Sequence, residues 1–202
     1  TRDMGSVSVL GFDPSNRGHQ SREWRNRIGI VLQTSGDAGD LTVFETINHF
    51  HGYYSNPRDV EEVINSVGLK EKEDSLIRNL SGGQRRRLDV ALGIIGNPEL
   101  IFLDEPTTGF DPEARRAFWS LIKTLRSDGA TIVLTTHYLD EAEALADRVA
   151  VINRGVIAEI STPADLGGRA TSQATVHWRD GAQLKSEKTD NPTAVIAALS
   201  AT

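Results

Sequence analysis

The chain has 202 residues, enough for one well-packed domain with a small appendage. Its 38% hydrophobic and 25% charged residues are typical of a globular protein, and the absence of cysteine excludes disulfides and cysteine-built metal sites. The net charge of −6, with no basic run beyond Arg85-Arg86-Arg87, argues against a nucleic-acid partner. No uncharged stretch approaches the roughly 18 residues that a membrane helix needs, and residues 1–16 contain no apolar segment of a signal peptide.

The first hundred residues predict two strands and then a helical region. Alternating residues predict a strand at Val7–Leu10, and an apolar run predicts another at Ile28–Leu32. Three helices should follow: one capped by Thr42 with Glu45 three residues later, one with Pro57 near its first turn and Gly68 at its end, and one opened by Ser81 and closed by Gly96-Asn97-Pro98. This helical run interrupts the strand pattern, so we interpret it as an inserted subdomain.

Strands and helices alternate again in the second half. Leu100–Leu103 is apolar on both faces, which is typical of a central parallel strand. The clearest helix follows Pro112, where apolar residues recur along one stripe: Ala114, Ala117, Phe118, Leu121, Ile122 and Leu125. We then expect a buried strand at Thr131–Thr135, a short helix, a hairpin through Asn153-Arg154-Gly155, and, after Gly168, a strand, a turn and a helix. The alternation predicts an α/β fold with a mainly parallel sheet.

Polar side chains follow three of the predicted strands. Asp104 and Glu105 end one strand, His137 ends another and Gln33 ends a third. Ligands of open α/β sheets bind beyond the carboxyl ends of the strands, so these groups should meet at one edge. Phosphoryl transfer from a magnesium nucleotide to water requires such a set. The alternative is that the Asp-Glu pair only begins a helix, as an N-cap and a first-turn acid.

The stretch "LSGGQ", Leu80–Gln84, places Ser81 and two glycines at the beginning of a predicted helix. Unpaired first-turn N–H groups, the helix dipole and the close approach that glycine allows together favour an anion there. The alternative is an ordinary serine N-cap followed by a flexible turn.

Taken together, these motifs resemble the ATP-binding cassette family, the motor subunits of ABC transporters. "LSGGQ" matches the signature motif, and "LIFLDEPTTGFDP" matches the Walker B strand with its catalytic glutamate and dimer-contact loop. His137 matches the switch histidine and Gln33 the loop glutamine, and the resemblance covers roughly Gly5 to Leu166. The segments after Thr107 and Thr136 look most like cassettes of bacterial multidrug and antibiotic-resistance exporters of the daunorubicin-resistance type.

The resemblance implies a role for each motif residue, with ATP and Mg²⁺ as cofactors. Asp104 would hold the magnesium through water, Glu105 would be the general base, and His137 would bind the γ-phosphate. Gln33 would contact the metal and the attacking water. Nucleotide contacts to the opposite cassette would come from Ser81, Gly82, Gly83 and Gln84, and Asp111 would contact the partner across that interface.

The resemblance also implies the architecture and the partners. We expect a partial P-loop NTPase of the RecA-like kind, divided into residues 1–41 (core remainder), 42–98 (helical signature subdomain), 99–166 (core with Walker B and the switch histidine) and 167–202 (accessory segment). We expect separate transmembrane permease subunits, a homodimer or a paired second cassette, no nucleic acid, and a peripheral place on the cytoplasmic face of the plasma membrane. The helical insert from Thr42 to about Asn79, together with the Gln33 loop, should dock the membrane subunit. The alternative is that its apolar residues pack entirely within the subdomain, namely Phe44, Ile47, Phe50, Tyr53 and Tyr54.

One element of the family pattern is missing from the sequence. The phosphate-binding loop GxxxxGK[ST] should precede Gln33, but no Gly-Lys pair occurs anywhere in the chain. We therefore expect that an N-terminal portion is absent and that the 202 residues alone do not hydrolyse ATP. Two other classes stay open: a cytosolic ABC-type ATPase acting on ribosomes or DNA, and a non-catalytic regulatory subunit. Neither the transported substrate nor its direction follows from the residues.

Overall fold

The computed structural model describes residues 4–16, 18, 20–32, 39–168, 174–180, 183–189 and 191–200. It divides into two compact units, Thr1–Glu141 and Ala142–Thr202. This boundary differs from the sequence-based one at residue 167, and the four-part division stays a prediction. The longer elements of the first unit are α1 (Gln20–Asn26), β1 (Ile28–Val31), α2 (Val43–His51), α3 (Val60–Ser66), α4 (Gly82–Ile94), β2 (Leu100–Asp104), α5 (Pro112–Ser127) and β3 (Thr131–Thr135).

A three-stranded parallel sheet of order β1-β2-β3 forms the centre of this unit. Ile28 lies opposite Leu100, which in turn lies opposite Thr131, so the three strands end at the same edge. The α/β class and the central place of β2 are thereby confirmed. Ile101 of β2 is fully buried, as a strand covered on both faces requires.

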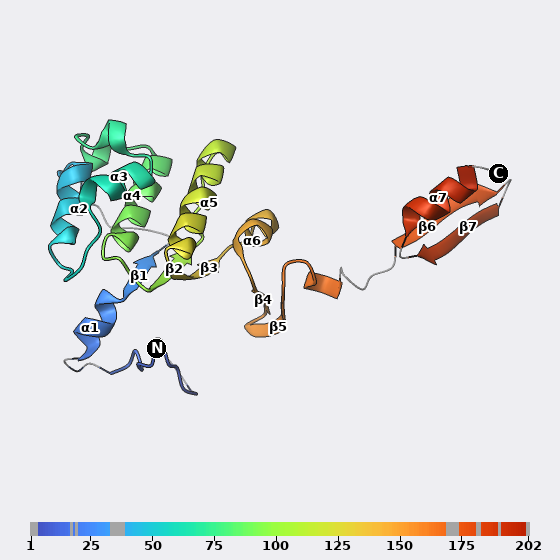
Figure 1. The fold of residues 1–202 in the computed structure, drawn as a ribbon, viewed down its shortest axis with the longest axis horizontal. Coiled ribbons are helices and arrows are strands. Elements are labelled where there is room, and N and C mark those ends of the chain that lie inside the picture. Colours follow the sequence, from blue (N-terminus) through green and yellow to red (C-terminus); the bar gives the residue numbers. More distant parts are fainter. Residues whose placement is uncertain are drawn as a thin grey trace. The chain divides into compact units, whose positions relative to one another are not determined.

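The helical region is confirmed between β1 and β2. Helices α2, α3 and α4 gather in one group next to α5 (Figure 1). Short 3₁₀ turns, Lys70–Lys72 and Ile77–Asn79, connect α3 to α4. Helix α4 lies very close to β1, because a Cβ atom on Gly29 would stand 2.1 Å from the main-chain oxygen of Gly93. Only glycines allow this approach, which fixes α4 against the sheet.

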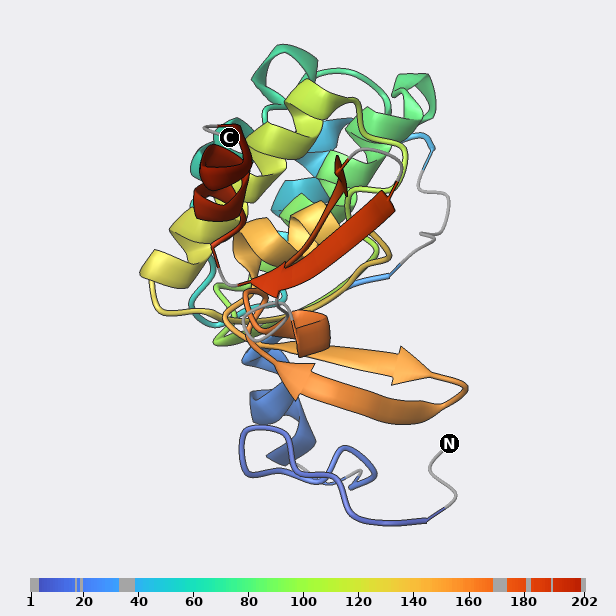
Figure 2. The same cartoon turned by 90° about the vertical axis from the view of Figure 1, so that its right-hand side faces the viewer.

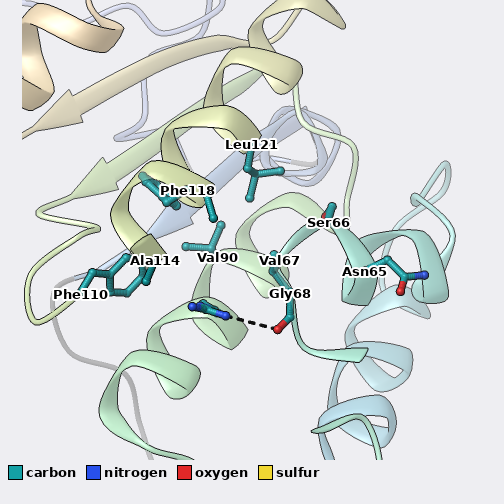
Figure 3. Close-up of a pocket in the computed structure, with 11 residues that line it drawn as sticks. Asn65, Ser66, Val67, Gly68, Val90, Phe110, Ala114, Phe118 and Leu121 are labelled. Carbon is teal, nitrogen blue, oxygen red and sulfur yellow. Dashed lines mark hydrogen bonds between the residues drawn. The ribbon is translucent and has the colours of Figure 1, made fainter. Parts of the chain in front are cut away.

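The amphipathic stripe of α5 is confirmed in part. Ala114, Phe118, Leu121, Ile122 and Leu125 are buried, whereas Ala117 is exposed. A cavity of about 220 Å³ lies between the end of α3, α4 and the first half of α5 (Figure 3). Val67, Val90 and Phe118 give it a mainly apolar lining. None of the predicted site residues lines this cavity.

The second unit contains β4 (Val149–Asn153), β5 (Val156–Ser161), the 3₁₀ turn Leu166–Gly168, β6 (Ala174–Asp180), β7 (Gln183–Thr189) and α7 (Pro192–Ser200), while α6 (Leu139–Leu145) crosses the boundary between the units. Figure 2 shows the β4–β5 hairpin as two orange antiparallel arrows. Its turn uses Arg154 and Gly155, both with positive φ, as the sequence predicts. Within the described parts of the chain, no helix has both the length and the apolar character needed to cross a membrane.

Two expectations about the strands are wrong. Val7–Leu10 is not a strand: Val9 and Phe12 exchange two backbone hydrogen bonds across a tight turn in which Leu10 and Gly11 have positive φ. The alternating residues at Val7–Leu10 therefore lead into a local turn and do not form a strand. Thr131–Thr135 is a strand but not a buried one, since Val133 is 46% exposed. Among the described residues β3 pairs only with β2, which leaves it at the side of the sheet.

Two further boundaries differ from the prediction. Helix α3 begins at Val60, with Asp59 as its N-cap, so Pro57 lies before the helix instead of in its first turn. The Asp59 side chain accepts from the amide of Glu62, and this cap decides where the helix begins. In the tail, β6 and β7 form a hairpin where one strand was predicted. The sequence of β7, QLKSEKT, lacks the apolar alternation that would have indicated a strand.

Candidate functional site

The two carboxylates follow the central strand as expected. Asp104 is the last residue of β2 and is exposed, and its Oδ1 accepts a hydrogen bond from Thr135 Oγ1 at the end of β3. The next helix, α5, begins only at Pro112 and is capped by Asp111. The alternative that Asp104 and Glu105 merely open a helix is therefore excluded.

Glu105 has an unusual backbone. Its φ angle is +45°, in the left-handed region that glutamate rarely adopts. Its amide donates to the main-chain oxygen of Thr135 at 3.1 Å, which continues the β2–β3 pairing by one residue and holds this conformation. Such strained positions concentrate at functional sites, where the surrounding structure stabilises them.

His137 meets Glu105 at this edge. His137 Nδ1 lies 3.2 Å from Glu105 Oε1, and Thr108 Oγ1 donates to Glu105 Oε2 at 3.4 Å. The structure thus brings together three of the four residues predicted at the strand ends. The fourth, Gln33, lies outside the described residues, because the structure describes the chain as far as Leu32 and again from residue 39.

Contacts to α5 hold the segment that carries His137. The Arg115 guanidinium lies 4.4 Å from the centre of the Tyr138 ring and forms an ion pair of 3.6 Å with Asp140. Glu141 is fully buried and accepts from Thr107 Oγ1 at 2.9 Å and from Trp119 Nε1 at 3.2 Å. The sequence alone gives no signal for these residues, because their contacts form only when the loop after Glu105 and the beginning of α6 lie together.

The signature stretch begins α4. Ser81 is the N-cap: its Oγ accepts from the Gln84 amide at 3.2 Å, and Gln84 Oε1 accepts from the Ser81 amide at 3.0 Å. This capping box confirms that Ser81 caps its helix, but it does not explain why glycines stand at the two positions between Ser81 and Gln84. Gly82 and Gly83 have no positive φ, and a Cβ atom on either would meet no other atom within 4 Å. The chain's own packing therefore does not require glycine at either position.

Asp111 is the N-cap of α5, and its Oδ1 accepts from the Ala114 amide at 2.8 Å. This hydrogen bond is the main cause that lowers the pKa of the Asp111 carboxyl below its usual range. A contact of Asp111 with a partner across an interface stays a prediction, as do the nucleotide contacts of Ser81–Gln84.

The donor set at the edge fits a metal that arrives with a nucleotide. Among the described residues no group of three or more His, Asp or Glu side chains is arranged to hold a metal ion by itself. Asp104 and Glu105 instead offer two neighbouring carboxylates, one of them exposed. Mg²⁺ in nucleotide sites is commonly held by one or two carboxylates together with phosphate oxygens and water.

More than half of the chain matches a known protein family. Residues 1–108 match the model of the family described as ABC transporter. The chain belongs to this family. The part matched ends just after Asp104 and Glu105 and includes the whole of α4 with its signature stretch.

Two curated relatives of this ABC transporter chain come from bacteria. It is 42% identical over 166 residues to the daunorubicin/doxorubicin resistance ATP-binding protein DrrA of Streptomyces peucetius, covering 79% of this chain and 49% of that protein. It is 41% identical over 158 residues to the Nod factor export ATP-binding protein I of Rhizobium sp. (strain N33), covering 76% and 51%. The chain thus spans about half the length of these relatives.

Solved structures share the fold. One is titled as the ATP-binding subunit of an ABC transporter (TM-score 0.72, 22% identity, 84% of this chain and 73% of that one). Another is a dimeric post-hydrolysis state of the ATP-binding cassette MJ0796 bound to ADP and Pi (TM-score 0.70, 22% identity, 80% and 74%). The expected cassette fold is thereby confirmed.

Proposed function

We propose that Asp104, Glu105 and His137 form the ATP-hydrolysing site of an ABC transporter subunit. The observation that carries this proposal is the 3.2 Å approach of His137 Nδ1 to Glu105 Oε1, beside the exposed aspartate that ends the central strand. A metal-binding carboxylate, a proton-accepting carboxylate and an imidazole are the groups that hydrolysis of a magnesium-bound phosphate needs.

In this proposal each residue has one task. Asp104 would hold a magnesium ion, which would supply positive charge opposite the phosphates. Glu105 accepts the proton of the attacking water, and its fixed backbone keeps Oε1 beside His137. His137 donates to the γ-phosphate. Gln33, which follows Leu32 in the sequence, would orient the attacking water and help to hold the ion.

The signature stretch acts on a second copy's nucleotide in this proposal. Ser81 and Gly82 are exposed at the beginning of α4, where first-turn amides and the helix dipole favour an anion. The open surroundings of Gly82 and Gly83 support an approach from outside the chain, since nothing inside it occupies that space. Gln84 holds the serine in place through the capping box, and Asp111 contacts the partner.

Phosphate release tests the function. A full-length form that carries these residues together with a GxxxxGK[ST] loop should release phosphate from ATP only when Mg²⁺ is present. The 202-residue chain is the negative control. Without the phosphate-binding loop it lacks most of the contacts to the nucleotide phosphates, so it should not hydrolyse ATP. A full-length form that binds Mg-ATP but releases no phosphate would contradict the proposal.

The relatives' names support a transport role. DrrA is a resistance ATP-binding protein, and the Rhizobium protein is an export ATP-binding protein. We propose that this chain powers export of a drug or another small molecule through separate transmembrane subunits, as a homodimer or with a second cassette, at the cytoplasmic face of the membrane.

Helix α2 is the proposed dock for the transmembrane subunit. Ile47 is fully buried, but Phe44, Phe50 and Tyr53 are 38%, 36% and 65% exposed. The alternative that all the aromatic residues pack within the subdomain is therefore wrong for these three. Phe50 and Tyr53 contact each other edge to face, with 5.9 Å between ring centres, and so present one continuous apolar area.

Cysteine cross-linking tests the dock, since the chain has no cysteine of its own. Phe50→Cys and Tyr53→Cys should cross-link to a co-expressed membrane subunit, whereas Lys123→Cys, exposed on α5, should not. Cross-links that form at residue 123 but at neither residue 50 nor residue 53 would place the dock elsewhere.

A further inference from the structure

Arg86 is a buried cation that the proposed chemistry does not use. It lies on α4, five residues after Ser81, and is only 7% exposed. Its guanidinium donates to three main-chain oxygens: Nε to Pro106 at 3.1 Å, Nη2 to Asp104 at 2.5 Å, and Nη1 to Leu32. One side chain of the signature helix therefore reaches both the end of β1 and the end of β2.

The three oxygens belong to the peptide groups next to the proposed site residues. Leu32 contributes the carbonyl of its bond to Gln33, and Asp104 contributes the carbonyl of its bond to Glu105. Pro106 directly follows Glu105. One guanidinium thus holds the backbone on both sides of the proposed general base, and it also holds the carbonyl of Leu32 just after β1.

The burial of this cation is partly compensated by nearby carboxylates. Burial lowers the pKa of the Arg86 guanidinium, and the carboxylates of Asp89, Asp104 and Glu105 oppose that change. An arginine side chain stays protonated in proteins and offers five N–H donors in one plane, which suits three diverging carbonyls. The neighbouring Arg87 differs: it is half-buried and donates to a single carbonyl, that of Gly68, at 3.4 Å.

We propose that Arg86 is a positioning residue that joins the signature helix to the catalytic edge, fixing the backbone of Asp104 and Glu105 and the carbonyl of Leu32 just after β1. The catalytic part of this inference rests on the proposed function. The close approach of Gly29 to Gly93 keeps the far half of α4 against β1. A movement of α4 at its Ser81 end would therefore be transmitted to the backbone of Glu105 through the Arg86 side chain. Lysine could not replace arginine here, since an ammonium group is a point donor.

The first test needs no activity. In the isotope-labelled 202-residue chain, Arg86→Lys should shift the carbonyl ¹³C resonances of Leu32, Asp104 and Pro106. Arg87→Lys is the matched control and should shift that of Gly68 while leaving the other three unchanged. Unchanged resonances of Leu32, Asp104 and Pro106 in a folded Arg86→Lys chain would overturn the proposal.

The second test separates positioning from substrate binding. In a full-length form with a phosphate loop, Arg86→Lys should lower kcat by about 10- to 100-fold, because a displacement near 1 Å at a catalytic group can cost that much. The KM for ATP should stay within about 3-fold, since the Arg86 guanidinium is buried and donates to three main-chain oxygens of its own chain. A kcat within about 2-fold of the parent, or a raised KM alone, would contradict the proposal.

The outcomes remain distinguishable if the proposed function fails. A full-length parent that hydrolyses no ATP would remove the function, while the carbonyl resonances would still decide whether Arg86 holds these peptide groups. Should Arg86→Lys not fold, Arg86→Gln keeps two N–H donors without the charge and enters the same measurements. If neither variant folds, Arg86 serves only folding and the inference is wrong.

Discussion

Replacing Glu105 by glutamine is expected to abolish ATP turnover in a full-length form of the protein while leaving ATP binding intact. The amide keeps the shape of the side chain and its place beside His137 Nδ1, 3.2 Å from Glu105 Oε1 in the parent chain. An amide cannot accept the proton of the attacking water. The loss of kcat should reach at least about 10²-fold, the low end for removal of a general base.

Two measurements on the same protein check this result. Phosphate release gives kcat, and calorimetric titration with Mg-ATP gives the dissociation constant, which should change little. Glu113→Gln is the matched control, because it makes the same charge change on an exposed first-turn residue of α5 outside the site. Near-normal turnover in Glu105→Gln would move the proton-accepting role elsewhere, with His137 as the first candidate.

Where a local pattern decided the structure, the sequence predicted it well. The Thr42–Glu45 capping box, the serine cap of α4 and the apolar run of β2 all depend on residues within a few positions of each other. The meeting of Glu105 and His137 also followed, because the carboxyl ends of parallel strands share one edge.

Features that depend on tertiary contacts could not be predicted in this way. The left-handed backbone of Glu105 is imposed by Thr135 on the neighbouring strand, and no local residue signals it. Val7–Leu10 has a strand-like alternation, but Leu10 and Gly11 turn the chain back before a neighbour can pair.

Arg86 is an intermediate case. In the sequence Arg86 belongs to the basic run Arg85-Arg86-Arg87. It also precedes Val90, Gly93 and Ile94 by four, seven and eight residues, which is the spacing of one helix face. A charged residue in line with a buried stripe could have been identified as a buried cation. Its three carbonyl partners come from segments 18 to 54 residues away, and these only the fold reveals.

The proposal that the signature stretch acts on a second copy's nucleotide predicts an effect on ATP turnover as large as that of Glu105→Gln. Ser81→Arg places a bulky cation where a hydroxyl and bare amides should meet a γ-phosphate. Gly83→Ala is a milder variant, and its added methyl meets nothing within 4 Å in its own chain, so it should leave the fold intact. In a homodimer of either variant every composite site carries a defect, and preorganised anion donors of this kind contribute about 10²–10³-fold in rate.

A mixed dimer separates the two chains' contributions. One full-length chain carries Ser81→Arg or Gly83→Ala, and the other carries an intact signature but a broken phosphate loop. One composite site then holds both defects, and the other joins an intact phosphate loop, with Asp104, Glu105 and His137, to an intact signature. Size-exclusion chromatography with a tag on one chain verifies that mixed dimers form.

Phosphate release after mixing the two purified variants tests most directly the claim that this sheet edge and a second copy's signature make one ATPase site. Each variant alone should be nearly inactive, and the mixture should regain activity well above either parent. If mixed dimers form and activity does not rise, Ser81 and Gly83 serve their own chain's nucleotide or only begin α4, and the composite site is wrong.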